Sequence, residues 1–223
     1  MVATVPIPAA AVVRLHADER VLQTATGAAF LAAARDRQVL IRTLGREPKR
    51  AAAVARLAPA ERDDLAARRD LERLSAQSPP QVGGVSVGPA LHAGKLRSFY
   101  GEAQRRFGIR WQLLAAINFV ESDFGRARTT ARADAQGPMQ FEPATWRRYG
   151  MGGDVYSAHG TILAAANLLA ANGGRTNERA ALEHYNHSPL YRDAVLHLAH
   201  RMTTVPTAFR EYYAWTLYLK RKR

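Results

Sequence analysis

Residues 111–121 read WQLLAAINFVE, and this stretch decides the fold of the second half of the chain. Only Gln112, Asn118 and Glu121 are polar, and the apolar residues cover nearly the whole circumference of a helix. A helix that is apolar almost all round is a buried helix. The stretch therefore predicts a core helix that ends in a carboxylic acid.

The position of Glu121 at the end of this helix gives its carboxyl a possible chemical role. Burial disfavours the ionised carboxylate, and so does the negative end of a helix, for which Gly125 is a suitable C′ residue. A carboxyl that stays neutral at pH 7 beside glycine-containing loops is what a general acid requires. The helix pattern alone fits a solvated glutamate at a frayed helix end equally well.

The segment after Glu121 contains no long apolar run up to residue 150. Gly137-Pro138 marks a turn, and Pro143 suits the first position of a short helix. The connection between them carries Met139, Gln140 and Phe141, which we expect near Glu121. A loop of this composition behind a buried acid suits a sugar-binding groove, although any tight loop could look the same.

Three short blocks follow one another along the chain: Glu121-Ser122, Gly137-Pro138-Met139-Gln140 and Tyr185-Asn186. In this order they resemble the signature blocks of soluble-type lytic transglycosylases, approximately E-S, G-L-M-Q and A-Y-N, a family that shares a lysozyme-like fold with goose-type lysozymes. The resemblance covers roughly residues 107–200. Within it, residues 137–150 and 181–199 look particularly like secreted members from high-GC Gram-positive bacteria.

The chain departs from the family pattern at three positions. Pro138 replaces the usual leucine, His184 replaces the usual alanine, and Glu142 stands where the family often has an apolar residue. These changes affect the expected shape of the groove more than the acid itself. A serine that often contacts the substrate N-acetyl group is also missing, and Thr129 or Thr130 could take its place.

The resemblance implies a peptidoglycan lytic transglycosylase, which cleaves the β-1,4 bond between N-acetylmuramic acid and N-acetylglucosamine and forms a 1,6-anhydro product. Most glycosidases use two carboxylates, whereas this family uses one, first as acid and then as base. We expect Glu121 to take both roles. Two alternatives stay open: a lysozyme-type hydrolase in which Asp134 assists, and a non-catalytic wall-binding module, which would not need a buried acid.

The same resemblance assigns the other site residues. The Tyr185 hydroxyl is expected to approach the catalytic carboxyl, although a tyrosine that simply packs on the core is common. Gln140 is expected to hydrogen-bond to sugar or backbone, and Met139 to form a groove wall. The full set of expected substrate-binding residues is Ser122, Thr130, Met139, Gln140, Phe141 and Asn186. For Phe141, core packing explains the residue at least as well as stacking on a sugar.

Composition limits the partners. The chain has 223 residues, no cysteine and a net charge of +13. Its seven histidines form no zinc-binding pattern, so we expect neither a metal nor a cofactor. The charge fits nucleic acid, an anionic membrane or an anionic wall polymer, or only reflects an arginine-rich genome. No nucleic-acid-binding signature accompanies the positive charge. A basic helical nucleic-acid-binding protein would also leave the three sequence blocks unexplained.

No stretch is apolar enough for a transmembrane segment, and the N-terminus is a poor signal peptide. We therefore expect a secreted or wall-associated protein whose signal peptide has been removed, with peptidoglycan glycan strands as its partner.

The chain divides into three zones by composition. Residues 1–75 are rich in alanine, arginine and leucine and predict two or three helices, including 28–44 and 59–74. A segment with paired prolines and glycines follows at 76–89 and predicts a linker. From residue 90 to 223, helical patterns recur at 91–107, 110–123, 143–149, 158–171, 178–186, 189–202 and 207–219. The predicted fold class is all-α or nearly so: a lysozyme-like helical catalytic domain with an N-terminal helical extension.

Overall fold

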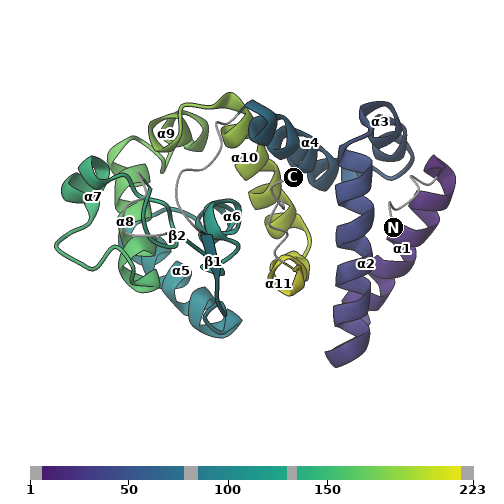
Figure 1. Ribbon diagram of the computed structural model, residues 1–223, viewed down its shortest axis with the longest axis horizontal. Helices are drawn as coiled ribbons and strands as arrows, with labels where there is room; N and C mark the ends of the chain where they lie inside the picture. Colours follow the sequence, from purple (N-terminus) through teal and green to yellow (C-terminus); the bar gives the residue numbers. More distant parts are fainter. Residues whose placement is uncertain (1–6, 78–84, 130–134, 217–223) are drawn as a thin grey trace. The chain divides into compact units, whose positions relative to one another are not determined.

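The computed structural model describes residues 7–77, 85–129 and 135–216, and they are nearly all helical, as the sequence predicts (Figure 1). The backbone contacts divide the chain into two compact units. In described residues, the first unit contains 7–77 and 200–216, and the second contains 85–129 and 135–199. In these ranges no helix is long and apolar enough to cross a membrane.

The first unit is built from helices of the N-terminal zone and a return segment from the C-terminal end. Its elements are α1 (Pro8–Thr24), α2 (Gly27–Gly45), α3 (Pro48–Leu57), the short 3-10 helix η1 (Pro59–Glu61), α4 (Arg62–Gln77), the end of α10 (Pro189–Thr204) and α11 (Ala208–Ala214). Three of these helices begin at a proline, whose fixed φ suits the first helical turn. The predicted helices at 28–44 and 59–74 are present, whereas α1 and α3 raise the number of α-helices in this zone above the two or three expected.

A buried network of charged side chains stabilises the first unit. Arg37 is fully buried and lies 2.7 Å from Glu211 and 2.8 Å from Asp64, and it also pairs with Glu61. Arg201 lies 2.9 Å from Glu211 and 2.7 Å from Asp64. Buried charges require such partners, because an unpaired ion in the protein interior is costly. The network therefore groups residues 200–216 with the N-terminal helices, while the division of the chain at 76–89 stays a prediction.

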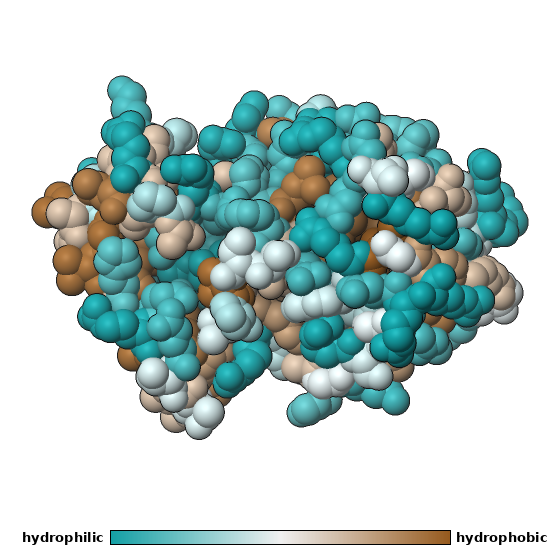
Figure 2. Space-filling view, turned by 180° about the vertical axis from the view of Figure 1, so that it is seen from behind, coloured by the Kyte–Doolittle hydropathy of each residue, from teal (hydrophilic) through white to brown (hydrophobic). Residues whose placement is uncertain are grey.

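Part of the surface of the first unit is apolar. Ile7 and Val13 are 68% and 67% exposed, and Leu31 and Val39 of α2 are also exposed. Figure 2 shows hydrophobic side chains on the surface over α1. These side chains add nothing to the core of their unit.

The second unit surrounds the predicted core helix. Its elements are β1 (Val85–Val87), α5 (Ala93–Phe107), α6 (Trp111–Ser122), β2 (Ala127–Thr129), α7 (Pro143–Tyr149), α8 (Ala158–Ala171), α9 (Glu178–Tyr185) and α10 up to residue 199. Residues 113–117 of α6 are fully buried, and α6 contacts both α5 and α8. The helix predicted from WQLLAAINFVE is thus the core of this unit.

A small sheet has one strand before the core helix in sequence and one strand after it. β1 and β2 pair in antiparallel fashion, with Val85 opposite Thr129 and Val87 opposite Ala127. Strands of three residues show no sustained alternation, so the sequence did not predict them. They connect the chain before α5 to the segment directly after α6.

The end of α6 differs from the expected glycine stop. The helix ends at Ser122, and Asp123, Phe124 and Gly125 follow with φ angles of 50°, 61° and 83°. Left-handed backbone is uncommon for residues other than glycine and costs conformational energy. The Gly125 amide donates a 2.9 Å hydrogen bond to the Ser122 hydroxyl, which helps to hold this sharp turn next to Glu121.

Candidate active site

Glu121 lies in the last turn of α6 and contacts a tyrosine from α10. The Tyr191 hydroxyl donates a 2.6 Å hydrogen bond to Oε1 of Glu121, the one hydrogen bond that this carboxyl makes among the described residues. Burial raises the pKa of Glu121 to about 7, although the hydrogen bond from Tyr191 acts in the opposite direction. The carboxyl is therefore about half protonated at neutral pH, so it can both donate and accept a proton.

Tyr185, the tyrosine expected to approach this carboxyl, makes a different contact. Its hydroxyl donates a 2.7 Å hydrogen bond to the carbonyl oxygen of Met139. Its ring stacks on Tyr191, with centroids 6.3 Å apart and planes 5° from parallel. The charge of Glu121 also raises the pKa of Tyr185, after the larger effect of burial. Tyr185 thus lies beside Glu121, while its catalytic role stays a prediction.

Sequence reasoning missed Tyr191. It lies in the first turn of α10, a helix that begins at Pro189 as predicted. The available signal was this helix start, because it places Tyr191 shortly after the end of α9, where Tyr185 lies. Tyr191 is 2% exposed, and burial and the nearby carboxylate raise its pKa well above the usual value. Its phenol therefore stays protonated and can act as a fixed hydrogen-bond donor.

Ser122, expected to bind substrate, is instead directed into the protein. It is 2% exposed, and its hydroxyl lies 2.5 Å from the carbonyl oxygen of Pro138. Because the same hydroxyl accepts the Gly125 amide, Ser122 connects the turn after α6 to the Gly137-Pro138 turn. Its hydroxyl hydrogen is used inside the protein, so the geometry gives Ser122 a structural role.

The second block, at residues 137–140, forms a tight turn. Gly137 has φ 71°, and a Cβ atom there would lie 1.8 Å from the carbonyl oxygen of Val155, so only glycine fits. Gln136 and Phe141 close the turn through two backbone hydrogen bonds of 2.9 and 2.8 Å. Gln140 has φ 51° and donates a 2.8 Å hydrogen bond from its side chain to the Gly137 carbonyl. The side chain of Gln140 therefore supports the turn that carries it.

Met139 and Phe141 are buried rather than exposed to a groove. Met139 is fully buried and Phe141 is 3% exposed. The Phe141 ring meets Trp146 and Tyr185 edge to face, at centroid distances of 5.3 and 6.1 Å. Both side chains thus support the site from inside, and Phe141 follows the core-packing alternative.

The remaining expected residues are placed as follows. Asn186 follows the last residue of α9, and its side-chain oxygen accepts a 2.9 Å hydrogen bond from the Ser188 amide. It therefore shapes the connection between Tyr185 and Tyr191. Thr130 and Asp134 lie outside the described residues.

Asp123 is the acid nearest to Glu121 in sequence, but its side chain pairs with an arginine. It is 8% exposed and lies 3.3 Å from Arg126. Burial raises the pKa of Asp123 to about 6, against the lowering effect of Arg126. In the part of the chain that the structure describes, no group of acidic, histidine or cysteine side chains could hold a metal ion.

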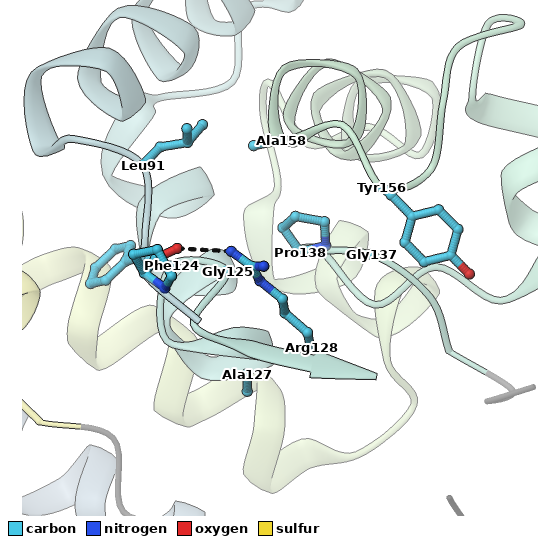
Figure 3. A pocket seen from close by; sticks show the side chains of 10 residues that line it. Leu91, Phe124, Gly125, Ala127, Arg128, Gly137, Pro138, Tyr156 and Ala158 are labelled. Carbon is cyan, nitrogen blue, oxygen red and sulfur yellow. Dashed lines mark hydrogen bonds between the residues drawn. The ribbon is translucent and has the colours of Figure 1, made fainter. Parts of the chain in front are cut away.

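A pocket adjoins the two turns that Ser122 connects. Its volume is about 490 Å³, and Figure 3 shows its lining, which includes Gly125, Arg128, Pro138 and Tyr156. The Arg128 guanidinium donates a 3.1 Å hydrogen bond to the Pro89 carbonyl at one wall. Apolar side chains of Leu91, Phe124 and Ala158 provide other parts of the wall. The pocket thus offers apolar surface with one cation and one phenol.

Comparison with known proteins agrees with this geometry. Residues 98–193 match the family model described as "Transglycosylase SLT domain". Among curated proteins, the chain is 32% identical over 122 residues to "Membrane-bound lytic murein transglycosylase F" of Thiobacillus denitrificans (strain ATCC 25259 / T1). That match covers 53% of this chain and 26% of the relative, so the chain spans about a quarter of the relative's length. No solved structure matches significantly.

The matched segment contains Glu121, the 137–140 turn and both tyrosines of the site. The family suggested by the three sequence blocks is the family that the comparison finds. Residues 98–193 are therefore similar to the transglycosylase domain of the SLT family, and the curated relative is a lytic transglycosylase.

Proposed function

We propose that this protein is a peptidoglycan lytic transglycosylase that cleaves the β-1,4 bond between N-acetylmuramic acid and N-acetylglucosamine, with Glu121 as acid and then base. The observation that carries the proposal is the Glu121 carboxyl, whose pKa is raised to about 7 and whose contact is the Tyr191 hydroxyl, 2.6 Å away. The SLT domain match supports the same substrate class.

In the first step, Glu121 gives its proton to the glycosidic oxygen, and the bond from that oxygen to C1 of the muramic acid residue breaks. The carboxylate that forms is stabilised by the hydrogen bond from Tyr191, which strengthens when its acceptor becomes charged. The substrate's own acetamide can stabilise the positive charge at C1. One protein carboxyl is therefore sufficient for this step.

In the second step, the Glu121 carboxylate takes the proton of the C6 hydroxyl, and the C6 oxygen bonds to C1 to close the 1,6-anhydro ring. The proton that Glu121 gave away stays on the hydroxyl of the departing sugar, the C6 hydroxyl proton replaces it on Glu121, and no water is consumed. A pKa near the working pH allows the same group to donate and to accept. Tyr185 and Gln140 support this cycle by holding the 137–140 turn beside the two tyrosines.

The pocket of Figure 3 adds a candidate substrate-binding surface beside the 137–140 turn, although Glu121 is not among its lining residues. It shares Gly137 and Pro138 with the turn that Ser122 holds. Apolar walls with one guanidinium suit a ligand with small alkyl groups and a carboxylate, which glycan-linked peptides possess. We infer a site of action at the cell wall, where this substrate lies.

Digestion of purified peptidoglycan followed by mass spectrometry tests the proposal. Wild type should release fragments with 1,6-anhydro ends, while Glu121→Gln, which keeps the size and the hydrogen-bond acceptor, should release none. Fragments with reducing ends would instead identify a hydrolase in which Asp134 assists. Binding to peptidoglycan without any cleavage by wild type would identify a non-catalytic binding module.

A further inference from the structure

Three exposed arginines gather on the second unit, on elements that do not carry Glu121. Arg106 lies in the last turn of α5, Arg148 lies in the last turn of α7, and Arg175 lies between α8 and α9. We call Arg106, Arg148 and Arg175 the arginine cluster. All three are exposed, and all belong to the second unit.

Side-chain contacts connect the segments that carry the cluster. Arg106 lies 3.9 Å from the sulfur of Met151, just beyond α7. Arg175 donates a 2.8 Å hydrogen bond to the carbonyl oxygen of Phe107, which directly follows Arg106. The ends of α5 and α7 and the segment after α8 therefore meet at one place.

Two further contacts connect Arg148 with the segment after α8. The Arg148 guanidinium lies 5.3 Å from the centre of the Tyr149 ring, and the Tyr149 hydroxyl lies 3.4 Å from the side-chain amide of Asn172. Asn172 is three residues from Arg175. The three arginines therefore lie on segments of the second unit that contact one another. Arg105 and Arg147 adjoin the cluster along the chain and are also exposed.

The arginines of the cluster have no acidic partner among the described residues, unlike several other arginines of this unit. Arg110 pairs with Glu178, and Arg192 pairs with Glu183 and Asp193. Within 85–129 and 135–199, no carboxylate lies within 4.0 Å of Arg106, Arg148 or Arg175. Arginines in a last helical turn also interact favourably with the helix dipole. That effect applies to Arg106 and Arg148, but it does not apply to Arg175, which lies between α8 and α9.

We propose that the arginine cluster binds a polyanion with recurring phosphates, namely the phosphodiester polymers attached to peptidoglycan, and so holds the enzyme on the wall. This proposal rests on the proposed function, which places substrate and polymer in the same material. Guanidinium groups suit it because they bind phosphate oxygens in a fork-like geometry. Nucleic acid carries phosphates too, but the chain has no nucleic-acid-binding motif, and the cluster belongs to the domain that carries Glu121.

Sedimentation of the full-length chain with purified walls tests the proposal, with and without removal of the phosphodiester polymers by acid. The test variant is Arg106→Gln/Arg148→Gln/Arg175→Gln. The matched control, Arg20→Gln/Arg35→Gln/Arg56→Gln, removes the same charge from exposed positions of the first unit. At low salt the test variant should bind untreated walls about tenfold more weakly than wild type, with a smaller salt dependence. The control variant should bind like wild type.

Three results would overturn the proposal. Equal weakening in both variants would indicate a general charge effect. Equal wild-type binding to treated and untreated walls would exclude the phosphodiester polymer. Stronger competition by a short DNA duplex than by poly(glycerol phosphate) would favour nucleic acid. Cleavage of soluble glycan fragments, measured in parallel, separates the two proposals: if wild type cleaves nothing but the test variant still loses polymer binding, the proposed function fails and the cluster stands.

Discussion

Replacement of Glu121 by glutamine removes a carboxyl whose charged form the fold disfavours, so it should change stability as well as activity. The pKa of Glu121 is about 7 in the folded chain, against an ordinary value of 4.5. As pH rises, the unfolded chain loses this proton first. The contribution of the neutral carboxyl to stability is therefore complete below pH 4.5 and is lost as pH rises through 7.

The size of this effect follows from the shift. A difference between 4.5 and 7 corresponds to about 3 kcal/mol of unfolding free energy, and solvent contact of the partly buried side chain reduces it to about 2 kcal/mol. Glutamine has no proton to lose, and its side-chain oxygen can still accept the Tyr191 hydrogen bond. The variant should therefore be more stable than wild type at pH 8.5, with a much smaller difference at pH 5.

The assay is chemical denaturation of both proteins at pH 5 and pH 8.5, together with digestion of peptidoglycan. Comparison of the two proteins cancels the contributions of other buried acids such as Asp123. Turnover by the variant should fall at least about 100-fold. If wild type and Glu121→Gln differed in stability by the same amount at both pH values, the raised pKa of Glu121 would be refuted. Near-normal turnover would remove Glu121 from the mechanism.

Four further predictions concern the neighbours of Glu121 and the first unit. Tyr191→Phe removes the hydrogen bond that lowers the pKa of Glu121, so the alkaline limb of the pH–activity profile should move up by about one unit. Tyr185→Phe should lower the melting temperature and leave the alkaline limb in place, because the Tyr185 hydroxyl bonds to a backbone carbonyl. If the alkaline limb moved equally in Tyr185→Phe and Tyr191→Phe, the distinction between the two tyrosines would be wrong. Ser122→Ala should cost about 1–2 kcal/mol in denaturation experiments, and unchanged stability would argue against its structural role. Arg201→Met should cost about 3–5 kcal/mol by the same measurement, because it leaves buried acids such as Glu211 short of a partner. A loss smaller than that of an exposed arginine variant would contradict a stabilising role of the buried network.

The same network changes what we expect of fragments. A fragment of residues 90–223 contains Arg201 and Glu211 without Arg37 and Asp64, so it should be less stable than a fragment of residues 79–199. Thermal unfolding of the two purified fragments compares them directly. A 90–223 fragment as stable as the shorter one would support the boundary predicted from composition.

Local sequence signals were sufficient for many helices. α7 starts at Pro143 as expected, and α7 and α8 both have the predicted bounds. Periodicity placed α2 within one residue at each end. The helix α1 was missed because its sequence gives little contrast between faces, and α3 because it has only 10 residues. β1 and β2 were missed because a strand of three residues is defined by its partner and not by its own pattern.

The candidate site also combines features that the sequence predicted with features that depend on the tertiary structure. The sequence by itself determined the buried helix, the acid at its end and the glycine turn at 137, because composition and spacing along one segment encode them. Only the tertiary structure decided that Tyr191, seventy residues from Glu121, donates to the carboxyl, that Ser122 is turned inward, and that Arg37 lies against Glu211. Such contacts join side chains from separate segments, and their geometry depends on how whole helices pack.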